Sequence, residues 1–157
     1  MSYQNLEKAL TLAPKCKFYT TVGGVSTENI AKSEQMLGVK FSKQCLKFYE
    51  DCGYLSFYGH EIFGIDPNDD SGELEGNSIA YALNDREEYG LPKEWIPIYN
   101  YEDGTLAYLD YANLNKEQEP RVISASYNGE EYEIEEVVSS DLGDFLLEMV
   151  NEGLEEN

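Results

Sequence analysis

Apolar and polar residues follow a helical period in the first third of the chain and predict three helices there. The apolar positions recur every three or four residues, and each segment carries a start or stop signal. The predicted boundaries are Tyr3 to Pro14, Ser26 to Gly38 and Ser42 to Gly53. Serine suits an N-cap because its oxygen accepts from an unpaired amide, and glycine suits the left-handed residue after a helix.

From residue 54 the period changes to two, which predicts strands. The predicted strands cover residues 54–58, 61–65, 95–101, 105–111, 121–127 and 130–137. Asp103-Gly104 and Asn128-Gly129 divide the last four into two tight hairpins, since such pairs accept positive φ angles. Pro97 lacks a backbone donor, so its strand is expected at a sheet edge or the proline near the strand start.

Two more helices complete the pattern. The first covers residues 78–89, with Ile79, Ala82, Leu83 and Tyr89 as its expected buried side. The second begins at an N-cap on Ser140 and buries Leu142, Phe145, Leu146, Met149 and Val150, and residues 151–157 are expected to fray. This order predicts one α+β domain with a core over about residues 27–150, in which helices flank a largely antiparallel sheet.

Charge separates the two parts of the chain. The net charge is −20 over 157 residues, and residues 1–60 carry 5 acidic and 7 basic side chains. Residues 61–157 carry the other 26 acidic side chains against 4 basic ones. Such asymmetry indicates either a positively charged partner or a surface selected for solubility alone. Direct binding to nucleic acid is excluded, because phosphates require clustered lysines and arginines.

The three cysteines and the N-terminus bear on location. Cys16, Cys45 and Cys52 are an odd number, and the first residues resemble no export or transit signal. No apolar run approaches the length of a membrane span. We therefore expect reduced thiols in a cytoplasmic protein, with Cys45 and Cys52 packed in the core and with no membrane partner.

The stretch FGIDPNDDSGELEGN, residues 63–77, is the most suggestive for chemistry, and it has no periodicity. Asp66, Asn68 and Asp70 match the first three ligand positions of an EF-hand calcium loop. The match then fails, because Ser71 stands where the loop needs glycine and Asn77 where it needs glutamate. Weak calcium binding stays open, but we expect a surface loop without a dedicated metal site.

Enzyme motifs are missing from the sequence. One histidine, His60, and three separated cysteines do not form a zinc motif. Neither a G-x-S-x-G elbow nor a phosphate-binding glycine loop occurs. Paired carboxylates for glycoside hydrolysis are too numerous to choose between. We expect no enzyme activity and no cofactor, and instead a binding protein whose carboxylates attract a basic partner, such as a nuclease that must be blocked quickly.

Several short motifs resemble the SUKH superfamily, the Smi/Knr-like proteins. They lie at Glu34, Leu37-Gly38, Phe48, Gly53, Ile62-Phe63-Gly64, Leu91-Pro92, Ile96 to Ile98, Asp103-Gly104, Leu109-Asp110 and Phe145-Leu146. The resemblance covers about residues 27–150. It departs from the family at Ser42, which replaces the usual proline, and at Gly143-Asp144, which replaces a small residue and serine.

The resemblance implies an α+β fold and two functions that stay open. Bacterial members are immunity proteins, each of which neutralises a cognate polymorphic toxin, often a nuclease. Yeast members are regulatory scaffolds with long disordered extensions, which this sequence lacks, so immunity is favoured. Leu37, Gly38, Gly64 and Asp110 are expected to determine the fold. The expected toxin-binding acidic residues are Asp66, Asp69, Asp70, Glu73 and Glu75, with Glu87, Glu88, Glu102 and Asp103 beside them.

Overall fold

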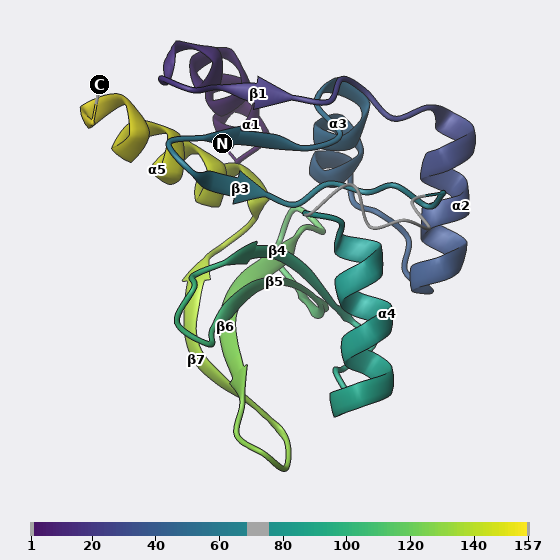
Figure 1. Cartoon of the computed structure of the whole chain (residues 1–157). Coiled ribbons are helices and arrows are strands. Elements are labelled where there is room, and N and C mark those ends of the chain that lie inside the picture. Colours follow the sequence, from purple (N-terminus) through teal and green to yellow (C-terminus); the bar gives the residue numbers. More distant parts are fainter. Residues whose placement is uncertain (1, 69–75, 157) are drawn as a thin grey trace.

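The computed structural model describes residues 2–68 and 76–156 and has the predicted α+β architecture (Figure 1). The helices are α1 (Ser2–Leu12), η1 (Ala13–Lys15, a 3₁₀ turn), α2 (Thr27–Leu37), α3 (Lys43–Asp51), α4 (Ser78–Tyr89) and α5 (Leu142–Glu155). The strands are β1 (Thr20–Thr21), β2 (Leu55–Phe57), β3 (His60–Ile62), β4 (Trp95–Asn100), β5 (Leu106–Leu114), β6 (Pro120–Tyr127) and β7 (Tyr132–Ser139).

The strands form two antiparallel sheets. The smaller has the order β1-β2-β3 and the larger the order β4-β5-β6-β7, so β4, which carries Pro97, lies at an edge as predicted. The sheets are joined where the amide of Phe63 donates to the carbonyl of Ile98 at 2.8 Å. A parallel bridge between Gly64 and Asn77 holds the two ends of the 63–77 stretch together.

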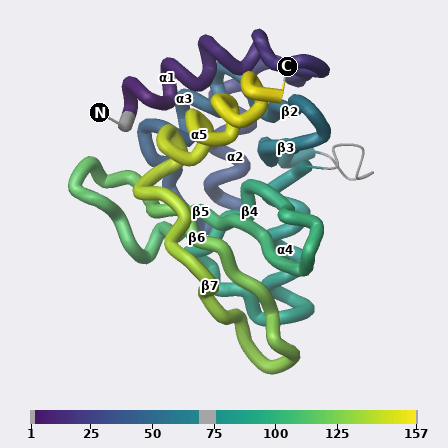
Figure 2. Tube along the Cα trace, turned by 90° about the vertical axis from the view of Figure 1, so that its left-hand side faces the viewer, coloured from purple at the N-terminus to yellow at the C-terminus, as the bar shows by residue number. Residues whose placement is uncertain are grey.

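Hydrophobic side chains cover both faces of the larger sheet. The main core lies between one face and the helices α1, α3 and α5, and α1 runs alongside α5 (Figure 2). It contains Leu6, Phe48, Phe57, Ile96, Leu109, Val122 and Leu146, among others. A smaller cluster of Leu91, Trp95, Tyr108, Ile123 and Ala125 occupies the other face. Neighbouring residues such as Tyr108 and Leu109 point to opposite faces because side chains alternate along a strand.

The buried side of α4 differs from the prediction. Ser78, Ile79 and Ala82 are buried, but Leu83 and Tyr89 are 38% and 47% exposed, so their predicted burial is wrong. The hydroxyl of Ser78 donates to the Pro97 carbonyl, which draws the start of α4 close to β4. The small side chains at the contact set which side of the helix is buried, so hydrophobicity alone misplaces it.

The ends of α5 also differ from the prediction. Its N-cap is Asp141, whose carboxylate accepts from the Asp144 amide at 3.0 Å, and Ser140 instead donates to the Asp144 carboxylate. The helix continues to Glu155 instead of fraying after residue 150. Gly153 is buried there, and a Cβ atom at this position would lie 2.8 Å from the Phe57 ring. Close packing against the smaller sheet therefore keeps the last turns helical.

Both predicted hairpins form, with turns longer than two residues. In the β4–β5 turn the amide of Tyr101 donates to the Thr105 carbonyl at 3.1 Å, and positive φ angles fall on Glu102 and Gly104. In the β6–β7 turn the amide of Asn128 donates to the Glu131 carbonyl at 3.0 Å. The carboxylates of the β4–β5 turn, Glu102 and Asp103, are exposed.

Candidate partner-binding face

Four of the predicted acidic residues, Asp69, Asp70, Glu73 and Glu75, lie outside the described residues. Asp66, at the start of the same stretch, is half-buried, and its carboxylate accepts from the Asn68 amide at 3.0 Å. Asn77 holds the Asp66 backbone from the other end of the stretch, because its side chain accepts from the Asp66 amide and donates to the Asp66 carbonyl. Asp66 therefore has a local structural role in shaping the loop.

The other predicted residues separate into two places. Glu87 and Glu88 are exposed on α4. Glu102 and Asp103 are exposed in the β4–β5 turn. Figures 1 and 2 place α4 and α5 on opposite sides of the larger sheet, and the β4–β5 turn lies away from the end of α4 that carries Glu87 and Glu88. The structure therefore does not bring these four residues together.

The β4–β5 turn instead meets acidic residues from two other elements around Tyr101. Partial burial, and after it the neighbouring Tyr99, Glu136, Asp103 and Glu148, together raise the pKa of Tyr101 to about 12. A negative charge raises the pKa of a phenol only when it lies close by, because the anionic form is then disfavoured. Carboxylates from the turn, from β7 and from α5 thus surround one exposed tyrosine.

We call this region the acidic face. It comprises Tyr99, Tyr101, Glu102, Asp103, Glu135, Glu136, Asp144, Glu148, Glu152 and Glu155. Burial raises the pKa of Tyr99, and Glu102 and Glu152 add to the increase, so the turn and α5 are joined at this residue as well. The acidic face thus takes its carboxylates from three elements that are distant in the sequence.

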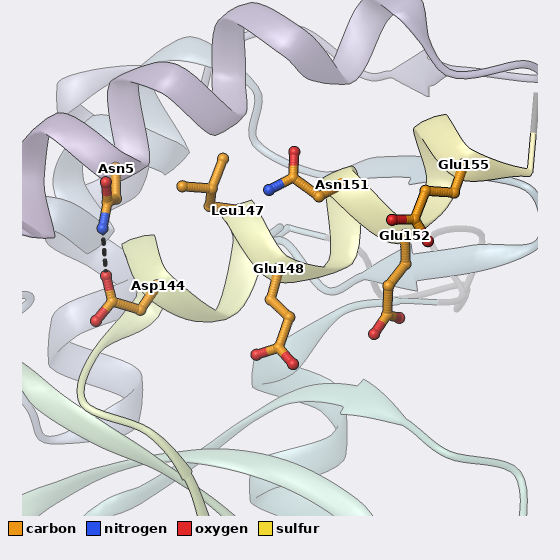
Figure 3. Close-up of a pocket in the computed structure, with 7 residues that line it drawn as sticks. All are labelled: Asn5, Asp144, Leu147, Glu148, Asn151, Glu152 and Glu155. Atoms are coloured by element: carbon orange, nitrogen blue, oxygen red, sulfur yellow. Dashed lines mark hydrogen bonds between the residues drawn. The ribbon is translucent and has the colours of Figure 1, made fainter.

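An acidic groove runs along the α5 side of the face (Figure 3). Its carboxylates are Asp144, Glu148, Glu152 and Glu155, and the Asn5 side chain on α1 donates to Asp144 at 2.7 Å. The residues recur every three or four positions, so they share one side of the helix. The helical period makes this row of carboxylates recognisable in the sequence, but none of the four was among the predicted binding residues.

The β7 side of the face lies where the larger sheet extends beyond α5. Glu135 accepts from the hydroxyls of Thr105 at 3.1 Å and Ser126 at 3.3 Å, so the β4–β5 turn and β6 both hold its carboxylate. Glu136 is exposed beside it. Neither residue could be recognised in the sequence as part of a binding face, because only strand pairing brings β7 close to the β4–β5 turn.

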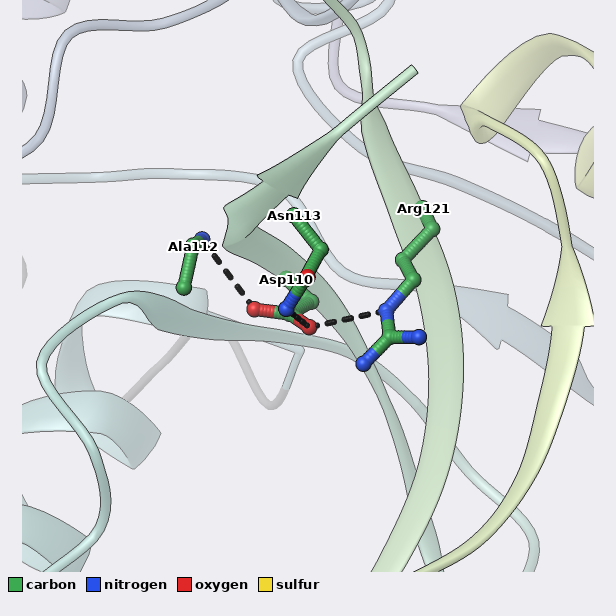
Figure 4. A network of polar contacts seen from close by, with 4 residues as sticks. All are labelled: Asp110, Ala112, Asn113 and Arg121. Carbon is green, nitrogen blue, oxygen red and sulfur yellow. Dashed lines mark hydrogen bonds and ion pairs between the residues drawn. The ribbon is translucent and has the colours of Figure 1, made fainter.

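The ion pairs found in the described part of the chain lie outside the acidic face. Within residues 2–68 and 76–156 the ion pairs are Lys47–Asp51 and Arg121–Asp110, both at 2.9 Å, and neither includes a carboxylate of the face. Asp110 is buried and also accepts from the Ala112 amide and the Asn113 side chain (Figure 4). This network holds the end of β5 against β6, which gives Asp110 the structural role that was expected.

The three cysteines and His60, which were considered as possible catalytic or metal-binding groups, are held by contacts within the fold. All three thiols are buried, and burial raises the pKa of Cys45 to about 11 and also raises that of Cys16 and Cys52. A thiol with a raised pKa stays protonated at neutral pH and is a poor nucleophile. His60 Nδ1 lies 2.8 Å from the Tyr99 hydroxyl.

The described part of the chain offers neither a group of metal-binding side chains nor a membrane-spanning helix. Among residues 2–68 and 76–156 no three acidic, histidine or cysteine side chains are grouped to hold a metal ion. No described helix has both the length and the apolar character to cross a membrane.

The comparison with known proteins identifies one family. The model of the SMI1 / KNR4 family (SUKH-1) matches residues 24–148. A comparison with curated proteins finds no match. The family match covers most of the chain and nearly the same range as the motifs from Glu34 to Phe145-Leu146. The chain therefore belongs to the SMI1 / KNR4 family (SUKH-1).

Proposed function

We propose that this protein is a non-enzymatic immunity protein that binds a basic toxin domain and neutralises it through the acidic face. One observation carries the proposal: Asp103 of the β4–β5 turn and Glu136 of β7 line one hollow with the exposed Tyr101, and Glu148 of α5 is close enough to raise the Tyr101 pKa. A surface of this kind combines long-range attraction with an aromatic contact residue, and tyrosine is enriched among the residues that dominate binding energy.

The charge of the face suits a toxin that binds nucleic acid. A nuclease cleft carries lysines and arginines to hold phosphates, and an acidic surface can cover the same groups. Electrostatic attraction can raise association rates from about 10⁵–10⁶ to about 10⁸–10⁹ M⁻¹s⁻¹ at low salt. Rapid capture protects the host because an active nuclease damages it within a short time. A nuclease is therefore the toxin class that we propose.

The proposal can be tested with the product of the neighbouring gene, by co-expression, co-purification and measurement of toxin activity. The informative variant is the double charge reversal Glu136→Lys with Glu148→Lys, since both carboxylates lie near Tyr101 and both are exposed. We expect it to weaken binding by about tenfold or more, mostly through slower association, and to reduce inhibition of the toxin.

The matched control is Glu87→Lys with Glu88→Lys on exposed positions of α4. It changes the total charge of the protein by the same amount as the first double variant. We expect its affinity to stay within about twofold of the original protein, because neither Glu87 nor Glu88 is among the carboxylates that act on Tyr101. Equal weakening by both double variants would exclude the acidic face. The absence of a co-purifying basic partner would exclude immunity, and a partner that binds without loss of activity would indicate a regulatory scaffold instead.

A further inference from the structure

A small pocket opens beside the acidic face, between the β2–β3 turn and the β4–β5 turn. We call it the tyrosine pocket, and its principal lining residues are Tyr58, His60, Glu61, Tyr99, Tyr101 and Glu102. Its volume is about 260 Å³, which is below the roughly 300–1,000 Å³ typical of sites for whole small molecules. The pocket is therefore of a size for one side chain of a partner.

Aromatic rings form the walls of the tyrosine pocket. The rings of Tyr99 and Tyr101 are 5.0 Å apart between centroids, and their planes are inclined at 84°. His60 forms the next part of the wall, and its ring nitrogen Nδ1 is hydrogen-bonded to the Tyr99 hydroxyl. The faces of aromatic rings carry the negative part of the ring quadrupole. Such walls attract a cation that comes within about 6 Å.

Two carboxylates add negative charge to this aromatic cavity. Glu61 comes from β3 and Glu102 from the β4–β5 turn, and both line the pocket. Burial raises the pKa of Tyr81, and Glu61 and Glu102 raise it further, so the two carboxylates lie near the same phenol. The hydroxyl of Tyr54 donates to Glu61 at 2.6 Å and orients it. A cation in the pocket would thus meet both charges at once.

The backbone conformation of two lining residues is unusual. Tyr58 and Glu102 have φ angles of 50° and 65°, in the left-handed region where glycine is usual. The chain nevertheless has at these positions a tyrosine and a glutamate, which supply a ring and a carboxylate to the pocket. Glycine would relieve the backbone and remove both groups.

We propose that the tyrosine pocket receives one arginine side chain of the partner, whose guanidinium packs on Tyr99 and Tyr101 and pairs with Glu61 and Glu102. Arginine fits better than lysine because its guanidinium is planar, stacks on aromatic rings and presents several donors to carboxylates. The inference rests on the proposed function, since the arginine would belong to the basic toxin. It adds an anchoring contact to the general attraction of the face.

The test uses small analogues and does not need the toxin. Nα-acetyl-arginine methylamide is titrated into the protein while the backbone amide NMR signals of residues 58–63 and 99–102 are followed. We expect saturable shifts there, with a dissociation constant of about 1 mM or weaker, as suits a single side chain. The citrulline analogue has the same shape without the charge, and the lysine analogue has the charge without the planar fork. We expect no saturation with the former and weaker binding with the latter.

Two variants give the matched comparison. Glu102→Gln removes a charge from the pocket and should weaken binding of the arginine analogue by about tenfold. Glu136→Gln removes a charge from the acidic face outside the pocket and should leave it within about twofold. Equal effects of the two variants, or equal shifts with citrulline, would overturn the assignment. If the protein inhibits a toxin but does not bind the arginine analogue, only the role of the tyrosine pocket is excluded. If it binds the arginine analogue but has no toxin partner, only the immunity function is excluded.

Discussion

At the scale of single residues, two glycines of the family motifs have different structural roles. Gly38 ends α2 with a φ angle of 74°, and a Cβ atom there would have no neighbour within 4 Å. Gly64 follows β3, and a Cβ atom there would lie 1.4 Å from the Gly53 carbonyl oxygen. The sequence identifies both as determinants of the fold. The structure shows that one satisfies a backbone angle and the other a close approach of two chain segments.

This difference predicts unequal costs for the same substitution. Gly38→Ala should lower the free energy of unfolding by about 1–2 kcal/mol, the usual cost of a left-handed alanine. Gly64→Ala should lower it by more than about 4 kcal/mol, because two backbone segments must separate. Urea unfolding followed by circular dichroism measures both. Similar losses for the two variants would contradict the close approach at Gly64.

At the scale of elements, the 63–77 stretch is stabilised by one buried side chain. Asn77 caps α4 by accepting from the Ile79 amide at 3.1 Å, and it also holds the Asp66 backbone through both atoms of its amide group. It is 2% exposed, so these hydrogen bonds have no competition from water. The sequence marks this region as an acidic loop, but its anchor is an uncharged asparagine.

Removal of this anchor should cost more than removal of an ordinary cap. Asn77→Ala should lower the free energy of unfolding by about 2–4 kcal/mol, since it deletes three hydrogen bonds and leaves buried backbone groups unpaired. Ser26→Ala, which removes the single cap bond to the Asn29 amide on α2, should lower it by about 1 kcal/mol. Chemical denaturation gives both values. If Asn77→Ala costs no more than Ser26→Ala, the anchoring role is wrong.

At the scale of the whole molecule, carboxylates that are far apart in the sequence come together on the acidic face. The net charge of −20 is accompanied by two ion pairs within the described residues, Lys47–Asp51 and Arg121–Asp110. The carboxylates of the acidic face lie close to one another, so their mutual repulsion opposes folding at low salt. Such a concentration of like charge is a cost for stability that a basic partner would relieve.

Salt should therefore stabilise the isolated protein. Between about 10 mM and 150 mM sodium chloride the screening length falls from roughly 30 Å to 8 Å. We expect Tm to rise by about 2–4 °C, which corresponds to roughly 1 kcal/mol for a chain of this size. At low salt the Glu136→Lys and Glu148→Lys double variant should gain more in Tm than the Glu87→Lys and Glu88→Lys control. Differential scanning calorimetry measures both comparisons, and a Tm that falls with added salt would contradict the repulsion.

The sequence by itself determined the elements and the fold class. Helical spacing, serine caps and terminal glycines such as Ser26 and Gly38 act over a few residues, so they can be recognised without the fold. The two hairpins were predicted at Asp103-Gly104 and Asn128-Gly129 for the same reason.

The tertiary structure alone decided which acidic residues lie together. Asp103, Glu136 and Glu148 are on a turn, a strand and a helix, and they meet because three antiparallel hairpin pairings and the packing of α5 on the sheet bring those elements side by side. The composition gives the number of carboxylates but not the distances between them. The same packing left Glu87 and Glu88 on α4, apart from these carboxylates, and buried Asp110, because the position of a charge in space depends on contacts between residues far apart in the chain.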